Sequence, residues 1–264
     1  MELEHLLYEK SGRVAWITLN RPERRNSFGG LMRQEIVSVL EDAAADREIR
    51  CVVITGAGDR HFCTGGDVEE FATGKTQALE KTVSAERHAM CKAALLINRM
   101  EKPVIAAVNG VAAGGGVNLA LACDVRVASD RARFGQVFVR RGVHPDWGGI
   151  YFLPRLVGYA KACELIFGGD VIGAEEALKI GMVNQVVPHE NLREAAREMA
   201  VKFAKNAPIP IAFAKRGLQN FGRWDLAQAL DYESYVLSVC MQTQDIIEGF
   251  GAFLEKREPD FQGK

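Results

Sequence analysis

The chain has 264 residues, of which 48% are hydrophobic and 25% charged, as in an ordinary globular protein. The formal net charge is −1, so no overall positive field attracts nucleic acid or a membrane surface. No apolar run reaches the roughly 20 residues that span a bilayer, and the acidic start MELEHLLYEK does not suit a signal peptide. We therefore expect a cytoplasmic protein that binds neither nucleic acid nor membranes.

The first part of the chain alternates between strand and helix patterns. A hairpin is predicted from LLYE and RVAWITLN, and the helical period takes over in residues 31–45. Residues 51–55 and 104–108 are continuous apolar runs, which are typical of strands buried on both faces of a parallel sheet. A helix is expected between them, over residues 84–100.

The second part is mostly helical. Short strands are expected at residues 125–128, 133–134 and 183–187. Helices are expected at residues 192–205, 211–221, 226–241 and 246–256. The sequence therefore predicts an α/β core in residues 1–205 and an all-helical region in residues 206–264.

Six cysteines are spread widely along the chain, with no CxxC spacing and no nearby pair of histidines. This pattern does not suit a disulfide framework or a zinc site. We expect reduced cysteines that serve as small apolar side chains, and no metal site.

Each of the two buried strands is followed by a glycine-rich loop. One loop contains Gly65 and Gly66, and the other contains Gly114, Gly115 and Gly116. Ligands of α/β sheets bind at the carboxyl ends of strands, and glycine lets a backbone N–H approach them closely. The second loop also opens a helix, whose free N–H groups favour negative charge. Two such loops can direct two donors at one oxygen, an oxyanion hole suited to the enolate of a thioester.

Other roles for these glycines are weaker. A P-loop is excluded because GxxxxGK[ST] is absent, and GAG at residues 56–58 lacks the third glycine of a dinucleotide turn. Tight turns and close packing remain an alternative for either loop alone. The matching positions of the two loops favour the oxyanion hole.

Several segments together resemble one known family. HFCTGGDVEEF resembles the first signature of the enoyl-CoA hydratase/isomerase (crotonase) superfamily, and KPVIAAVNGVAAGGGVNLALACDVRVAS resembles the second. The resemblance continues to the end, where EGFGAFLEKREPDFQGK is similar to the family's C-terminus. It implies a spiral of ββα units with a helical C-terminal region, assembled as a homotrimer or a dimer of trimers. It also implies an acyl-CoA substrate and no separate cofactor, since coenzyme A is part of that substrate.

The resemblance also assigns site residues. The oxyanion donors are the backbone N–H groups of Gly66 and Gly115, and Asp67 is expected to organise the first loop. Substrate contacts are expected from Arg24, Cys63, Gly65, Asp67, Val68, Gly114, Phe138 and Trp147. Arg25, and Lys256 and Arg257 on a neighbouring subunit, are further candidates for the CoA phosphates, with a solvated surface position as the alternative.

The reaction is the point at which the chain departs from typical hydratases. Asn118 and Phe138 stand where those enzymes have two glutamates, and neither can titrate. A carboxylate appears instead in VHPDWGG, at Asp146, where the isomerase branch has its proton shuttle. The resemblance is strongest to the phenylacetate-pathway 1,2-epoxyphenylacetyl-CoA isomerases. Apolar walls from Phe138 and Trp147 would raise the pKa of Asp146 and make it a better base.

Three alternatives stay open. Asp146 could be a turn or helix N-cap residue, and the enzyme could be a hydratase with a non-standard acid or base such as His144. The chain could also be a non-catalytic homologue that binds acyl-CoA or RNA. His144 could equally orient Asp146 or line the pocket. The walls around the acyl group are expected mainly from residues 71–86, whose shape the sequence does not give.

Overall fold

The computed structural model describes the backbone of residues 2–72 and 79–264, and the side chains of residues 71–87 are not part of that description. The pocket walls expected from residues 71–86 therefore lie outside the described side chains.

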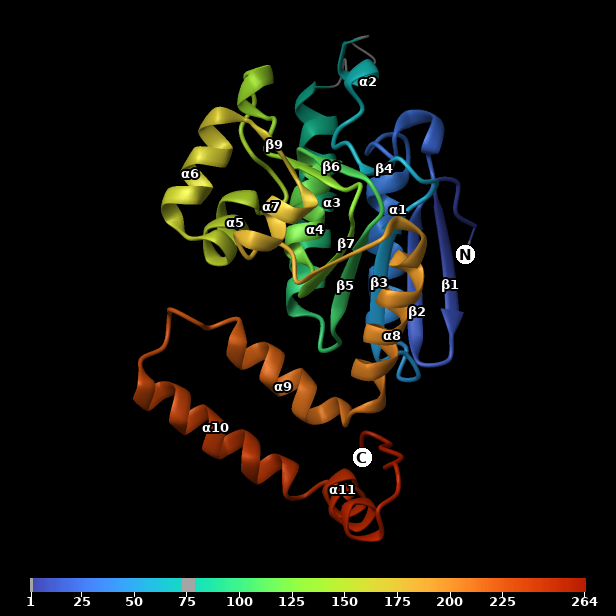
Figure 1. Ribbon diagram of the computed structural model, residues 1–264, viewed down its shortest axis with the longest axis vertical. Coiled ribbons are helices and arrows are strands. Elements are labelled where there is room, and N and C mark those ends of the chain that lie inside the picture. The colour runs from blue at the N-terminus through green and yellow to red at the C-terminus, as the bar shows by residue number, and fades with distance from the viewer. Residues whose placement is uncertain (1, 73–78) are drawn as a thin grey trace.

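A six-stranded sheet forms the centre of the molecule (Figure 1). Its strands, in spatial order, are β1 (Leu6–Ser11), β2 (Val14–Leu19), β3 (Cys51–Gly56), β5 (Val104–Val108), β7 (Val125–Ser129) and β10 (Gln185–Val187). The β1–β2 hairpin is antiparallel, and all other pairs are parallel. The two apolar runs predicted as buried strands are the neighbours β3 and β5.

A second sheet of short strands lies beside the first. Its order is β4 (His61–Cys63), β6 (Val111–Ala113), β8 (Arg133–Gly135) and β9 (Val171–Gly173). Strands β4 and β6 pair in parallel, with Cys63 opposite Ala112, and each is followed directly by a glycine loop. This pairing, which the sequence did not predict, brings the two loops side by side. Successive strand pairs followed by helices confirm the predicted ββα spiral.

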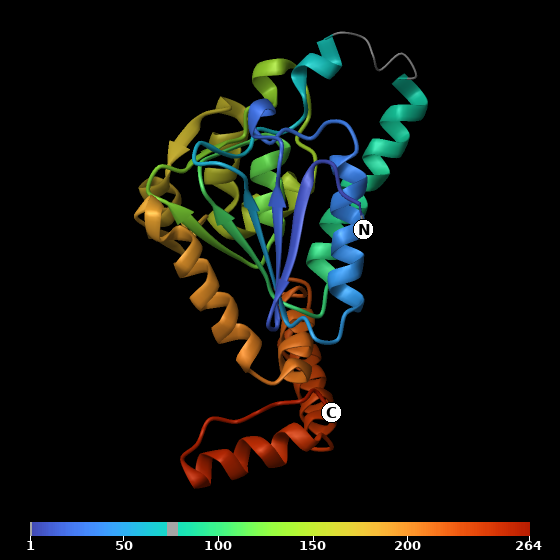
Figure 2. The ribbon, with the colours of Figure 1, turned by 90° about the vertical axis from the view of Figure 1, so that its right-hand side faces the viewer.

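Helices cover both faces of the large sheet (Figure 2). One face packs on α1 (Met32–Ala45), α3 (Leu79–Arg99) and α4 (Gly115–Ala122), and the other on α8 (Leu192–Lys205). Ile54 and Ala106 belong to the core under the first group, and Val53 and Ile105 to the core under α8. Successive residues of each strand thus point to opposite buried faces, which explains the continuous apolar runs.

The remaining elements of the core are short. They are the helices α2 (Val68–Ala72), α5 (Gly149–Val157), α6 (Tyr159–Gly168) and α7 (Ala174–Lys179), and the 3-10 helices Pro22–Arg24, Val139–Arg141 and His189–Asn191. No helix in the described part of the chain is long and apolar enough to cross a membrane.

The last helices extend away from the sheet (Figures 1 and 2). They are α9 (Pro208–Leu218), α10 (Leu226–Cys240) and α11 (Gln244–Glu255). Helix α9 begins three residues before the predicted start because Pro208 fits the first helical turn. Buried Lys215 ties this helix to the core, since its Nζ lies 2.7 Å from Oδ2 of Asp124. The division at residue 205 remains a prediction.

Candidate functional site

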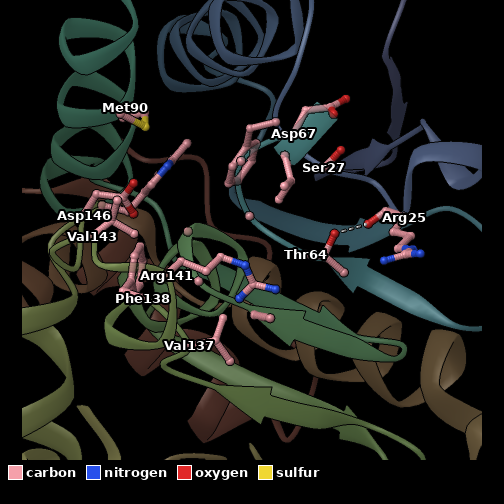
Figure 3. Close-up of a pocket in the computed structure, with 18 of the residues that line it drawn as sticks. Arg25, Ser27, Thr64, Asp67, Met90, Val137, Phe138, Arg141, Val143 and Asp146 are labelled. Atoms are coloured by element: carbon pink, nitrogen blue, oxygen red, sulfur yellow. Dashed lines mark hydrogen bonds between the residues drawn. The ribbon is translucent and has the colours of Figure 1, made fainter. Parts of the chain in front are cut away.

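A cavity of about 980 Å³ opens where β4 and β6 end. Its walls come from residues 23–33, from both glycine loops, and from residues 137–147. Figure 3 shows Arg25 and Thr64 toward one end of the cavity, and Met90, Val143 and Asp146 toward the other. The structure thus brings together segments that are far apart in the sequence, as an enclosed ligand site requires.

The two glycine loops approach each other closely at this cavity. A Cβ built on Gly65 would lie 3.1 Å from the N atom of Gly115, so only glycine fits there. The first loop is fixed to Phe28, which donates its N–H to Gly65 O at 2.8 Å. The N–H groups of Gly66 and Gly115 donate to no group in the described part of the chain. Both lie in the cavity wall, as an oxyanion hole requires.

Close packing explains the glycines that follow. A Cβ on Gly116 would lie 2.0 Å from the carbonyl oxygen of Cys63, and a Cβ on Gly115 would lie 3.1–3.2 Å from Trp147 and Phe28. The packing role considered for these glycines is therefore present together with the unpaired amides.

Asp67 holds the first loop through its side chain. Its Oδ1 accepts from the N–H groups of Glu69 and Glu70 at 3.2 and 3.4 Å, and its Oδ2 lies 3.3 Å from Nη2 of Arg21. Both members of the Arg21–Asp67 pair are buried, so the pair is screened little by solvent. Asp67 lines the cavity, but its contacts are those of a structural residue.

Asp146 lies in the cavity wall with its carboxyl group largely buried. Burial raises the pKa of Asp146 to about 6, although a hydrogen bond from its own backbone and the positive charge of Arg33 act in the opposite direction. Its Oδ1 is buried and has no hydrogen-bond partner among the described residues. The helix that follows, α5, takes Gly148 as its N-cap, so Asp146 does not have the capping role considered for it.

Asn118 explains how this loop is positioned. Its Nδ2 donates to the carbonyl oxygen of Asp146 at 2.8 Å, and its Oδ1 accepts from Nε2 of Gln136 at 2.7 Å. The side chain of Asn118 is fully buried against Gly149, where an added Cβ would lie 2.3 Å from Nδ2. Asn118 therefore supports the Asp146 loop, in the position where typical hydratases have a glutamate.

Apolar side chains enclose the site near Asp146. Phe138 and Trp147 are buried and line the cavity, as the sequence predicted. Trp147 stacks on Phe28 with ring centroids 4.6 Å apart and an interplanar angle of 20°. Its φ of 49° is in the left-handed region, which is costly for a tryptophan and is typical of positions held by their surroundings.

The basic residues predicted for the CoA phosphates are partly paired within the chain, and of these Arg24 and Arg25 line the cavity whereas Lys256 and Arg257 do not. Arg24 lines the cavity and forms an ion pair with Glu69. A CoA phosphate would have to compete with Glu69 for this guanidinium group. Arg25 also lines the cavity, in a left-handed backbone conformation. Arg257 is paired with Glu248 and Glu255. Lys256 is the left-handed C-cap residue of α11.

One predicted substrate contact, Cys63, lies outside the cavity wall. Cys63 is fully buried beside α4 and does not line the cavity, and burial raises the pKa of its thiol to about 12. His144 lines the cavity, which is one of the two roles considered for it, and its Nδ1 lies 2.7 Å from the carbonyl oxygen of Pro145. The remaining predicted contacts, Gly65, Gly114 and Val68, line the cavity.

Sequence reasoning missed several contributors to the wall, among them Phe28, Met90 and Arg141. Trp147 was predicted as a wall of the site, but nothing in the sequence indicated that Phe28 stacks on it.

Comparison with known proteins places this architecture in one family. A family model described as "Enoyl-CoA hydratase/isomerase" matches residues 9–264, so the chain belongs to the enoyl-CoA hydratase/isomerase family. It is 40% identical to a short-chain-enoyl-CoA hydratase of Clostridium acetobutylicum, over 98% of this chain and 97% of that protein. It is 37% identical to the 1,2-epoxyphenylacetyl-CoA isomerase of Escherichia coli, over 99% of this chain and 100% of that protein.

Solved structures support the same assignment. The crystal structure of an enoyl-CoA hydratase from Bacillus anthracis matches with a TM-score of 0.93 and 35% identity, over 99% of this chain and 100% of that one. The predicted superfamily and α/β fold are therefore confirmed.

Proposed function

We propose that this enzyme is an acyl-CoA isomerase that relocates a proton on an enoyl- or ring-bearing CoA thioester. The observation that carries the proposal is Asp146, a buried carboxylate with an unpartnered oxygen and a raised pKa in the wall of the cavity. An isomerase needs one group that takes a proton from one carbon and returns it to another. Among the cavity-lining residues of this part of the wall, Asp146 has the properties of such a group.

The amides of Gly66 and Gly115 supply the other half of the mechanism. For a 3-enoyl-CoA, the Asp146 carboxylate takes a proton from C2, and the electron pair of the broken C–H bond delocalises onto the thioester oxygen. The two N–H groups stabilise the resulting dienolate. The carboxylic acid then returns the proton to C4, which leaves the 2-enoyl-CoA and restores the carboxylate.

The test is turnover of a panel of 2-enoyl-, 3-enoyl- and ring-bearing CoA thioesters by wild-type enzyme and by Asp146→Asn. We expect double-bond relocation or ring opening in the wild type and a loss of at least about 100-fold in the variant, the lower value for general acid–base catalysis. Binding of a saturated acyl-CoA should persist in the variant. Near-full isomerisation by Asp146→Asn would contradict the proposal.

Hydration is the second candidate, because the relatives include the short-chain-enoyl-CoA hydratase of Clostridium acetobutylicum at 40% identity. A hydratase must also activate a water molecule, and Asn118, whose amide is hydrogen-bonded to Asp146 O and to Gln136, cannot titrate and so cannot serve as the acid or base for that water. Asp146 would then be the non-standard base. Rapid formation of 3-hydroxybutyryl-CoA from crotonyl-CoA, with no movement of double bonds in 3-enoyl-CoA, would favour the hydratase.

We also retain the phenylacetate-pathway substrate as a proposal, since the Escherichia coli relative is a 1,2-epoxyphenylacetyl-CoA isomerase. Conversion of the epoxide by this chain would support it.

A cytoplasmic location and the absence of a separate cofactor also remain predictions from the sequence.

A further inference from the structure

Arg141 presents a charged group to the cavity that the proposed reaction does not use. It is the last residue of the 3-10 helix Val139–Arg141, and its side chain is exposed. Its guanidinium group has no ion-pair or hydrogen-bond partner in the described part of the chain. Figure 3 shows the side chain reaching from beside Phe138 toward Thr64, on the side of the cavity away from Asp146. A ligand in the cavity can therefore approach this guanidinium group.

The 3-10 helix explains why this arginine faces the cavity while its neighbour does not. The N–H of Arg141 donates to Phe138 O at 2.9 Å, and side chains three residues apart in such a helix lie on the same side. Phe138 packs at the second glycine loop, since a Cβ on Gly114 would lie 3.8 Å from its ring. Arg140 does not line the cavity, and its Nη2 lies 2.6 Å from Oδ1 of Asp170. The backbone thus directs Arg141 alone to the cavity.

Arg25 supplies a second guanidinium group at the end of the cavity toward which Arg141 extends (Figure 3). Its side chain is exposed and also has no ion-pair partner among the residues that the structure describes. Its carbonyl oxygen accepts from Oγ1 of Thr64 at 3.4 Å, which ties its backbone to the first glycine loop. Two like charges in the wall of one cavity repel each other, and an anion between them is attracted by both.

The carboxylates at this end of the cavity do not neutralise these two groups. Oδ2 of Asp67 lies 3.3 Å from Nη2 of Arg21, and Glu69 forms its ion pair with Arg24. Glu23 adjoins Arg24 in the 3-10 helix Pro22–Arg24, and its charge acts on that arginine. The cavity thus keeps a site for an anion at the end away from the proposed base.

We propose that Arg141 binds the diphosphate of coenzyme A, from the wall opposite Arg25. This inference rests on the proposal that the cavity binds an acyl-CoA thioester. The acyl group must lie beside Asp146, whereas Arg141 extends to the other side, where the coenzyme A half of the substrate continues. The planar fork of a guanidinium group donates two parallel hydrogen bonds to phosphate oxygens. Arg141 therefore favours thioesters of coenzyme A over thioesters that lack phosphate.

The test compares butyryl-CoA with butyryl-pantetheine, which has the same thioester and arm but no phosphate. Dissociation constants are measured by calorimetry for wild type, Arg141→Gln and Arg140→Gln. The last is a matched control, because it makes the same charge change in the same 3-10 helix, outside the cavity. Arg141→Gln should bind butyryl-CoA at least about 10-fold more weakly than wild type, the lower value for a hydrogen bond to a charged group. It should bind butyryl-pantetheine as wild type does, and Arg140→Gln should bind both thioesters as wild type does.

Ionic strength gives a second readout. The dissociation constant of butyryl-CoA should rise with salt in wild type and rise less steeply in Arg141→Gln, because one screened attraction is missing. Arg141→Lys keeps the charge but loses the planar fork, so it should recover only part of the affinity for butyryl-CoA. Should Arg141→Gln not fold, Arg141→Lys serves for the same comparison of the two thioesters.

Equal affinity of wild type and Arg141→Gln for butyryl-CoA would overturn the inference. An equal loss with both thioesters would overturn it too, since the contact would then be to the arm and not to a phosphate. A loss confined to an acyl-CoA whose acyl group ends in a carboxylate, such as adipoyl-CoA, would place the anion on the acyl group and also refute it. A wild type that binds no acyl-CoA would instead contradict the proposed function, and this inference with it. Hydration in place of isomerisation would leave this inference unaffected.

Discussion

Asp146 carries a raised pKa because its carboxyl group is largely buried. A base must be ionised in the resting enzyme, so protonation below its pKa stops the reaction. We therefore expect kcat/KM for isomerisation to rise with pH and to reach half of its plateau near pH 6. A pH series between 5 and 8 measures this limb, with protein stability checked at each pH. A flat profile over this range would show that a different group is the base.

The same burial makes Asp146 a cost to stability. The folded-state pKa of about 6 lies above the ordinary pKa of an aspartate, about 3.9, so the folded state favours the protonated form. The raised pKa therefore adds to the free energy of unfolding while Asp146 is protonated. This contribution is complete below about pH 4 and is lost as the pH rises through about 6. At pH 8 the Asp146→Asn variant should be more stable than wild type by at most about 3 kcal/mol, since two pKa units correspond to that free energy.

Denaturant unfolding of both proteins at pH 5 and pH 8 measures this difference. The gain should shrink at pH 5, where wild-type Asp146 is mostly protonated in the folded state. A gain that is equal at both pH values would mean that the carboxylate is not desolvated as the structure indicates.

At the scale of elements, the second sheet decides how the site is assembled. Its strands have three residues each, which is too short to show an alternation of apolar and polar residues. Of these four strands, only the one at residues 133–134 was predicted. The large sheet and most longer helices could be predicted, because their buried faces give long regular patterns. The approach of the two loops depends on the pairing of β4 with β6, which is non-local and has no signature of its own.

The hydrogen bond that holds the Asp146 loop could not be predicted from the sequence either. The glycines, Asp67 and Asp146 could be found because they stand in segments that resemble motifs of the family. Asn118 could be recognised only as a missing glutamate, and its hydrogen bond to Asp146 joins residues far apart in the chain. The stacking of Trp147 on Phe28 is of the same kind.

Asn118 provides the prediction at this scale. Asn118→Asp keeps an oxygen that can accept from Gln136 but loses the Nδ2 donor to Asp146 O. We expect turnover to fall because the loop is no longer held, while Asn118→Ala should in addition lose at least about 2 kcal/mol of stability through two unpaired buried groups. Turnover and denaturant unfolding of the two variants measure these effects. Wild-type turnover in Asn118→Asp would show that the loop does not depend on this bond.

At the scale of the whole molecule, the last three helices expose many large apolar side chains. These are Leu218, Phe221, Leu226, Leu230, Tyr235, Leu237, Met241, Ile247, Phe250, Phe253 and Leu254. Apolar surface of this extent in one region is typical of an interface between subunits.

We therefore predict that the chain forms a homotrimer or a dimer of trimers through α9–α11. Sedimentation or light scattering at micromolar concentration should give three or six times the 29.0 kDa of one chain. Phe250→Asp, which places a charge among these side chains, should weaken the assembly, whereas the same change at an exposed position far from them, such as Val171→Asp, should not. A monomer in the wild type would refute this prediction.

The central claim is that two backbone amides hold a thioester oxygen while one carboxylate moves a proton beside it. A crystal structure with a bound acyl-CoA tests it most directly. We predict the thioester oxygen within about 3 Å of both Gly66 N and Gly115 N, with the Asp146 carboxylate facing C2 and C4 of the acyl chain. A thioester bound elsewhere in the cavity, or amides that turn away from it, would contradict this claim.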